Sequence, residues 1–99
     1  MNTIILIGRL TANANISTIN YNGEIKKVAK YTLAVERDKR DEVDFILCSV
    51  IDKGAEWAEK YIKKGSRICI EGSLRISTYT KDGLNLNKPE VIVRKQYFA

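Results

Sequence analysis

Residues 45–72 read FILCSVIDKGAEWAEKYIKKGSRICIEG, and in this stretch a helix pattern stands between two strand patterns. Residues 45–51 have the length and the apolar composition of a β-strand. A helix is predicted over residues 54–64, where lysines occupy the negative end of the helix dipole and Gly65 ends the helix. One stripe of this helix is apolar: Ala55, Ala58 and Ile62. A second strand follows from residue 68 through Gly72 to about residue 78.

The segment before this stretch contributes two more strands. Residues 4–7 are four consecutive apolar residues, which predicts a central strand buried on both faces. Gly8, in the same run, indicates a bend or a close approach of two backbones. Asn22-Gly23 is a strong hairpin signal because both residues tolerate positive φ. Residues 29–36 then alternate between apolar and polar, which predicts a strand with one core face.

After the central stretch, a turn is expected at residues 81–83 and a last strand at residues 91–93. Five strands with one helix between the third and the fourth match the OB-fold, a partly open Greek-key barrel. A ferredoxin-like fold needs two crossover helices, and an SH3-like barrel usually has no helix at this point. We therefore predict an all-β protein with a five-stranded OB-fold barrel. No linker or repeat interrupts residues 1–99, so we expect one domain.

The composition favours a polyanionic partner without establishing one. Seventeen Lys and Arg against twelve Asp and Glu give a formal net charge of +5, but many basic proteins bind no polyanion. There is no histidine, and the two cysteines lie apart in apolar runs. We therefore expect no metal, no cofactor and two buried, reduced thiols, at Cys48 and Cys69.

The same inventory makes an enzyme the least favoured class of function, because no nucleophile stands beside a plausible base. The N-terminal residues lead straight into a strand pattern, without the basic start and cleavage site of a signal peptide. No apolar stretch has the length that a membrane span needs. We expect a soluble, cytoplasmic protein.

Short motifs in a fixed order link the chain to a known family. They are Asn2 with residues 5–11 (ILIGRLT), residues 32–35 (TLAV), residues 44–46 (DFI) with Cys48, residues 61–66 (YIKKGS), residues 70–75 (IEGSLR), Tyr79 and the Asp82-Gly83 turn. Each motif is weak alone, but their order and spacing together are highly specific. Through them the chain resembles the bacterial-type single-stranded-DNA-binding proteins along nearly its whole length.

The resemblance implies an OB-fold that assembles as a homotetramer, with a dimer as the alternative. It also implies binding of single-stranded DNA with little sequence preference, in replication, recombination or repair. Family members commonly continue into a glycine-rich linker and an acidic tip that recruits partners, whereas this sequence stops at Ala99. Either a tail has been removed or this is a short form from a phage or mobile element. Partners recruited through such a tail are not expected for this chain.

Seven positions correspond to groove positions of the family: Phe45, Tyr79, Arg75, Lys53, Ile51, Arg37 and Lys39. Single-strand binding needs aromatic faces for stacking and cations for phosphates. Phe45 is expected to stack on a base, with Leu47, Ser49 and Ile51 on its face of the strand; the alternative is that Phe45 faces the core. Tyr79 is the second expected stacking residue, and its alternative is packing on a neighbouring strand.

The basic candidates match positions near the groove or in the loop that flanks it. Arg75 and Lys53 belong to the first group, and their alternative is simple solvation on the surface. Arg37, Lys39 and Arg40 belong to the loop at residues 37–42, where a charge cluster often only increases solubility.

Departures from the family pattern point to weaker binding than a typical member shows. Residues 36–39 read ERDK where an aromatic is common, and Ile51 replaces another aromatic, so two π-faces are missing. Trp57 is expected to be partly buried against the barrel or a neighbour. Two tyrosines are expected in the core, Tyr31 and Tyr97. Tyr21, beside the Asn22-Gly23 turn, is expected to be exposed and has no assigned role.

Two further functions remain open at the level of sequence. An OB-fold module can bind structured RNA, an oligosaccharide or a protein instead of single-stranded DNA, since the fold alone does not determine the ligand. A primosomal accessory protein on a related dimeric fold is the other alternative, and it would act chiefly through partner proteins.

Overall fold

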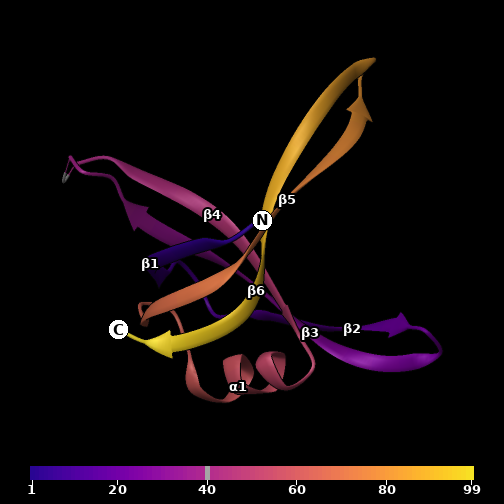
Figure 1. Cartoon of the computed structure of the whole chain (residues 1–99), viewed down its shortest axis with the longest axis horizontal. Helices are drawn as coiled ribbons and strands as arrows, with labels where there is room; N and C mark the ends of the chain where they lie inside the picture. The colour runs from indigo at the N-terminus through magenta and orange to yellow at the C-terminus, as the bar shows by residue number, and fades with distance from the viewer. Residues whose placement is uncertain (40) are drawn as a thin grey trace.

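The computed structural model describes residues 1–39 and 41–99, so the expectation for Arg40 lies outside the described residues. In chain order the elements are β1 (Ile4–Leu10), β2 (Asn15–Tyr21), β3 (Glu24–Glu36), β4 (Val43–Ile51), α1 (Lys53–Tyr61), β5 (Arg67–Lys81) and β6 (Leu84–Phe98) (Figure 1). The predicted order of strands around a single helix is confirmed. In this part of the chain no helix is long and apolar enough to cross a membrane.

Five of the strands form a closed ring, which confirms the predicted OB-fold. β1 pairs with β5, β5 with β6, and β4 with β3, all antiparallel. A short parallel pairing joins β4 to β6 at Cys48 and Ser49, opposite Val91 and Ile92. The ring is completed where Arg9 and Leu10 of β1 pair with the end of β3.

A sixth strand, β2, lies outside this ring and was not among the five expected. It pairs with the first half of β3 through the Asn22-Gly23 turn, whose residues have φ values of 51° and 84°. The predicted hairpin is therefore present, and β2 is its first arm. Every residue of β2 except Ile16 is exposed, so the strand has no core face to produce a hydrophobic alternation.

β1 is buried on one face only, contrary to the prediction for residues 4–7. Ile4 and Leu6 pack against the core, whereas Ile5 is 63% exposed and Ile7 46% exposed. In a barrel wall only one face of each strand points inward. Burial in the barrel core therefore does not explain why the two residues on the outer face of β1 are apolar. The expected close approach at Gly8 is confirmed, because a Cβ there would lie 2.6 Å from the carbonyl oxygen of Ala34.

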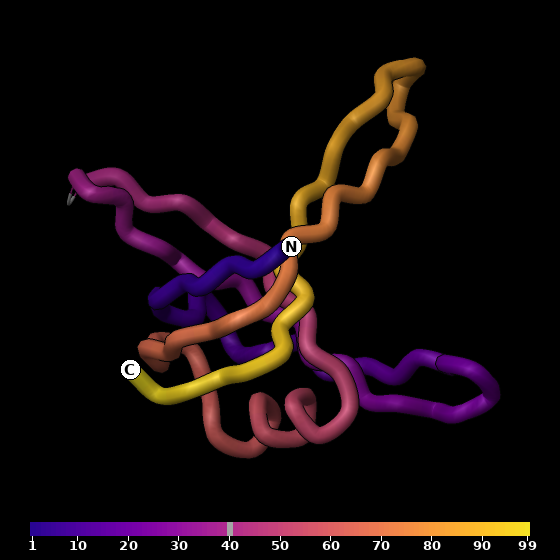
Figure 2. The backbone as a smooth tube through the Cα atoms, in the orientation of Figure 1, coloured from indigo at the N-terminus to yellow at the C-terminus, as the bar shows by residue number. Residues whose placement is uncertain are grey.

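β5 and β6 form a hairpin that extends well beyond the barrel (Figure 2). The strands were expected to end near residue 78 and to start at residue 91, but they reach Lys81 and Leu84 around the predicted turn. Their outer halves are mostly exposed, so an apolar pattern does not mark them. A register shift at Glu71/Gly72 lies within the barrel part of the hairpin, because Val91 and Val93, which pair beyond it, belong to the core.

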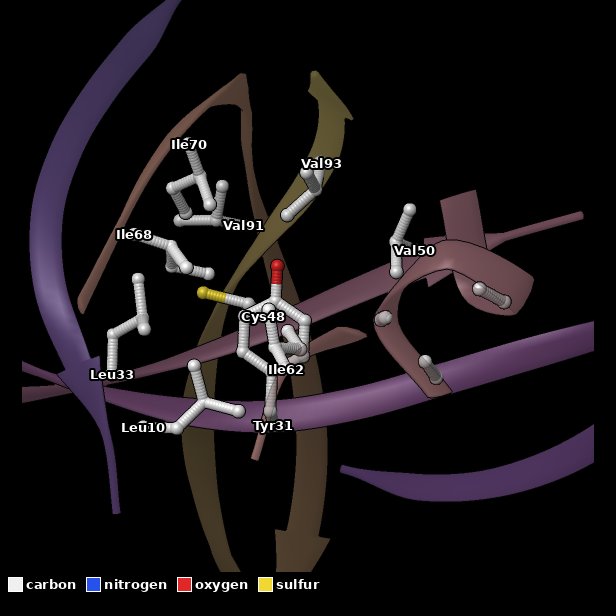
Figure 3. Close-up of a cluster of buried hydrophobic side chains, with 13 residues drawn as sticks. Leu10, Tyr31, Leu33, Cys48, Val50, Ile62, Ile68, Ile70, Val91 and Val93 are labelled. Atoms are coloured by element: carbon white, nitrogen blue, oxygen red, sulfur yellow. The ribbon is translucent and has the colours of Figure 1, made fainter. Parts of the chain in front are cut away.

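The core lies inside the ring and is covered at one end by α1 (Figure 3). The predicted stripe of the helix is buried, and it comprises Ala55, Ala58 and Ile62. Tyr31 is buried as expected, and its hydroxyl donates a hydrogen bond to Oε1 of Gln96 at 2.8 Å. Nε2 of Gln96 in turn donates to the carbonyl oxygen of Gly54 at 3.0 Å, which ties β6 to the start of α1.

Two expectations for the core are wrong. Tyr97 lies on β6 opposite Cys69 and is 50% exposed, near the end of the strand where Phe98 is exposed as well. Cys69 is half-buried, whereas Cys48 is completely buried as predicted. Both thiols are free.

The burial of Cys48 predicts a difference in reactivity between the two thiols. Burial, with a contribution from the nearby Glu90 carboxylate, raises the pKa of the Cys48 thiol to about 12. Since the thiolate is the reactive form, Cys48 should resist a disulfide reagent at pH 8 in the native protein and react once urea unfolds it. A Cys69→Ser variant isolates the Cys48 signal. Rapid native labelling of that variant at pH 8 would contradict the expected burial.

Candidate nucleic-acid interface

Three adjoining hollows form a groove across the outer face of the barrel, and all three are lined by Glu90 of β6. The first is lined by Ile4, Phe45, Ile46, Leu47, Leu74, Pro89, Glu90 and Val91. The second is lined by Lys30, Ser77, Tyr79, Lys88 and Glu90. The third is lined by Ile19, Tyr21, Val28, Lys30, Ser49, Ile51, Arg75, Glu90, Ile92 and Val93. We call this continuous surface the groove.

The outer face of β4 runs along the groove as the strand alternation predicts. Phe45 is 69% exposed and Ile51 is also exposed, whereas Cys48 and Val50 belong to the core. The alternative that Phe45 faces the core is therefore wrong. Phe45 lies in the first hollow and Ile51 in the third, so the two residues lie towards opposite ends of the groove.

The β5–β6 hairpin forms one wall of the groove. It brings Arg75 to the third hollow, beside Ile51, and Tyr79 to the second. Both side chains are exposed. Among the described residues, no carboxylate forms an ion pair with the guanidinium of Arg75. Of the seven predicted positions, the structure therefore brings four to one surface: Phe45, Ile51, Arg75 and Tyr79.

The centre of the groove holds a pair of charged residues that the sequence analysis did not single out as site residues. Nζ of Lys30 lies 4.0 Å from Oε2 of Glu90, and this oxygen is buried without a hydrogen-bond partner in the described part of the chain. Lys30 is one of the polar residues in the alternating segment 29–36. That alternation predicts that its side chain faces away from the core, and it is the only sequence signal for its position in the groove. Glu90 follows Pro89 in a segment whose sequence shows no alternation, so no pattern predicts which way the Glu90 side chain points.

The other three predicted residues lie away from the three hollows. Lys53 is exposed at the first position of α1, two residues after Ile51. Lys39 is exposed in the turn between β3 and β4. Arg37, at the same end of the molecule, donates hydrogen bonds to Asp44 at 2.7 Å and to Glu42 at 3.1 Å.

The contacts of Arg37 neutralise much of its charge locally. Its hydrogen bonds to Asp44 and then Glu42 raise the pKa of the guanidinium, and the bonds from Arg37 lower the pKa of the Asp44 carboxyl. A cation held by two carboxylates attracts a phosphate less strongly than an unpaired one does. Arg75 is therefore a stronger candidate for a phosphate contact than Arg37.

Trp57 lies at a different part of the surface, on α1. Its ring packs at 5.9 Å from the ring of Tyr61 and at 5.3 Å from that of Phe98, between ring centroids. The side chain is half-buried, as predicted. None of these three aromatic residues lines the groove.

The residues that the structure describes contain no group of three or more His, Cys, Asp or Glu side chains that could hold a metal ion. The groove instead combines exposed aromatic rings, aliphatic side chains and cations along one surface. Such a surface suits a flexible polyanion that carries flat, stackable groups.

Comparison with known proteins assigns this chain to a family. A family model described as the single-strand binding protein family matches residues 1–99. The single-stranded DNA-binding protein of Clostridium perfringens is 38% identical over 95 residues, which cover 94% of this chain and 62% of that protein. Single-stranded DNA-binding protein 1 of Clostridium acetobutylicum is 39% identical over 84 residues, which cover 80% of this chain and 74% of that protein.

A relative from Staphylococcus epidermidis, also a single-stranded DNA-binding protein, is 34% identical over 88 residues. The matched segments span 62% and 64% of the lengths of the C. perfringens and S. epidermidis proteins. The chain belongs to the single-strand binding protein family, which confirms the resemblance found in the sequence. Membership of this family also agrees with the expectation that the chain is not an enzyme.

Proposed function

We propose that residues 1–99 act as one domain that binds single-stranded DNA with little sequence preference, in replication, recombination or repair. The observation that carries this proposal is the placement of Phe45, Tyr79 and Arg75 along one groove, together with family membership. Such an arrangement lets bases stack on aromatic rings while cations neutralise phosphates.

In this proposal each side chain contacts a different part of the nucleotide. Phe45 and Tyr79 offer ring faces to bases, and stacking tolerates any base because every base has a π-face. Ile51 offers only an apolar surface. Arg75 attracts phosphates, whereas Glu90 at the centre of the groove repels them and offsets the charge of Lys30 beside it. The backbone of the strand should therefore follow the rim, with its bases directed inward.

Lys53, Lys39 and Arg37 are proposed as outer contacts that a longer strand reaches beyond the groove. Their exposed positions are compatible with long-range attraction, which salt screens. Arg37 should contribute least to the attraction of the strand, because Asp44 and Glu42 already bind its guanidinium. Action on DNA also implies a cytoplasmic, nucleoid-associated location for the protein.

The first experiment compares labelled oligo-dT, oligo-rU and matched duplex DNA by fluorescence anisotropy at several salt concentrations. Binding to oligo-dT that is much tighter than binding to duplex, and that weakens as salt rises, is the expected result. Equal affinity for duplex and single strand, or no binding, would contradict the proposal. It would favour an OB-fold module for another ligand or a protein that acts through partners.

Phe45 provides the sharpest test of stacking. Phe45→Ala should weaken binding of oligo-dT by about 1–3 kcal/mol, because the ring is exposed and its loss removes one stacking surface. Tyr97→Ala is the matched control, since that ring is also exposed but lies outside the groove. Anisotropy titrations give the affinities, and circular dichroism checks the fold. An unchanged affinity in a folded Phe45→Ala protein would remove Phe45 from the site.

Arg75 tests the contribution of phosphate contacts. Arg75→Ala should weaken binding to all sequences and make the slope of log K against log salt shallower by about 0.7, the value for one phosphate on a single strand. Arg67→Ala removes an equal charge from the same strand but outside the groove, and should leave the slope nearly unchanged. Identical slopes for the Arg75→Ala and parent proteins would argue against a phosphate contact.

We further propose that the protein is a homo-oligomer, a homotetramer with a dimer as the alternative. β1 supports this proposal, because from Ile4 to Gly8 it pairs within the described residues only with β5. Ile5 and Ile7 expose apolar side chains along this strand. An unpaired strand edge beside exposed apolar side chains is a favourable surface for a second copy of the chain.

Sedimentation measurements test this arrangement directly. The parent protein should sediment as a species larger than the 11.2 kDa chain. Ile5→Lys should raise the dissociation constant of the assembly roughly tenfold or more, since it places a charge where an apolar side chain would be buried. Leu84→Lys, at the exposed tip of the β5–β6 hairpin, is the control. A monomeric parent protein, or equal effects of the two substitutions, would count against assembly through β1.

A further inference from the structure

Tyr21, at the end of β2, lies in the same hollow as Ile51 and Arg75, although no expectation placed it there. Ile51 is the position where the sequence lacks an expected π-face. We propose that Tyr21 is a further base-stacking residue, and that the β2–β3 hairpin supplies from the opposite wall the aromatic surface that β4 lacks. This inference rests on the proposed binding of single-stranded DNA.

The strand geometry directs Tyr21 into the groove. Ile19 and Tyr21 are two residues apart on β2, so their side chains share one face, and both line the third hollow. Val28 and Ser49 are buried between this hairpin and β4, and they also line that hollow. The Tyr21 side chain remains 53% exposed, so a planar group in the hollow can reach it.

Two contacts connect the hairpin to the end of β4, immediately after Ile51. The backbone N–H of Asp52 donates a hydrogen bond to the carbonyl oxygen of Lys27 at 2.8 Å. The Asp52 carboxylate lies 3.7 Å from Nζ of Lys26. These contacts fix the base of the hairpin relative to Ile51, and so maintain the third hollow between the two strands.

The surroundings of the ring suit a nucleotide rather than a neutral apolar ligand. Nζ of Lys26 lies 5.8 Å from the centre of the Tyr21 ring, within the range of a cation–π contact. Lys30 and Arg75 line the same hollow. A base stacked on Tyr21 would therefore have cations within reach of its flanking phosphates.

Exposure alone does not distinguish Tyr21 from other tyrosines. Tyr97 is exposed to nearly the same extent, at 50%, but lies on β6 opposite Cys69 and outside the groove. Tyr61 is the last residue of α1, and its ring packs against that of Trp57. Tyr97 is thus a matched control for solvent exposure without a position in the groove.

Photocrosslinking tests the contact in the unaltered chain. An oligo-dT that carries 5-iodo-deoxyuridine at successive positions is irradiated in complex with the protein, and the crosslinked residue is identified by mass spectrometry. The proposal requires a crosslink at Tyr21 and none at Tyr97. If crosslinks form at Phe45 or Tyr79 but not at Tyr21 at any position, the inference fails while the proposed function stands. If anisotropy detects no complex, the proposed function fails first.

Substitution measures how much the ring contributes. Tyr21→Leu should weaken binding of oligo-dT about tenfold, within the range for loss of one stacking surface. Tyr21→Phe should retain the parent affinity because it keeps the ring, and Tyr97→Leu should change nothing. Equal affinities of the Tyr21→Leu and Tyr21→Phe proteins would overturn the proposal, since any contact would then not depend on an aromatic face. The exposed positions of Tyr21 and Tyr97 allow these substitutions without removing a core side chain.

Discussion

β3 hydrogen-bonds to three other strands, and both the barrel and the groove depend on this arrangement. Residues 24–30 of β3 pair with β2, residues 28–36 pair with β4, and Leu33 and Ala34 pair with β1. The pairing with β1 closes the ring, so that apolar side chains from all five strands can be buried together. The pairing with β2 continues the same strand beyond the ring as a hairpin. One strand therefore contributes both to the core and to a wall of the groove.

The groove contains both positive and negative side chains rather than a uniformly basic surface. Glu90 lines all three hollows, and Lys30 is its nearest cation in the described part of the chain. A carboxylate in the middle of a surface for a polyanion reduces the attraction there. Arg75 and Lys88 lie on the same hairpin as Glu90, and Arg75 is its direct partner across the two strands. These cations are exposed, whereas Oε2 of Glu90 is buried, so phosphates are favoured at the exposed cations and bases nearer the carboxylate.

Local patterns were sufficient to predict most of the barrel. The alternation at residues 45–51 put Phe45 and Cys48 on opposite faces, the family resemblance indicated that Phe45 faces outward, and the stripe of Ala55, Ala58 and Ile62 placed α1 on the core. The patterns were insufficient where strands leave the core, as in β2 and the outer halves of β5 and β6, because exposed strands show no hydrophobic period. The residues of the groove were also predicted only in part. Tyr21 and Glu90 reach the groove through pairings between distant segments, which no local pattern reveals.

The ring of strands also determines how the chain can fold. β1 requires β5 for its main partner, and the parallel contact of β4 requires Val91 and Ile92 of β6. The barrel therefore cannot close until almost the whole chain is available, and loop-closure entropy must be overcome before these contacts form. Domains with such high contact order fold more slowly than helical domains of similar size. The exposed apolar edge of β1 must remain unpaired for that interval, which makes self-association a kinetic risk during synthesis as well as a proposed property of the folded protein.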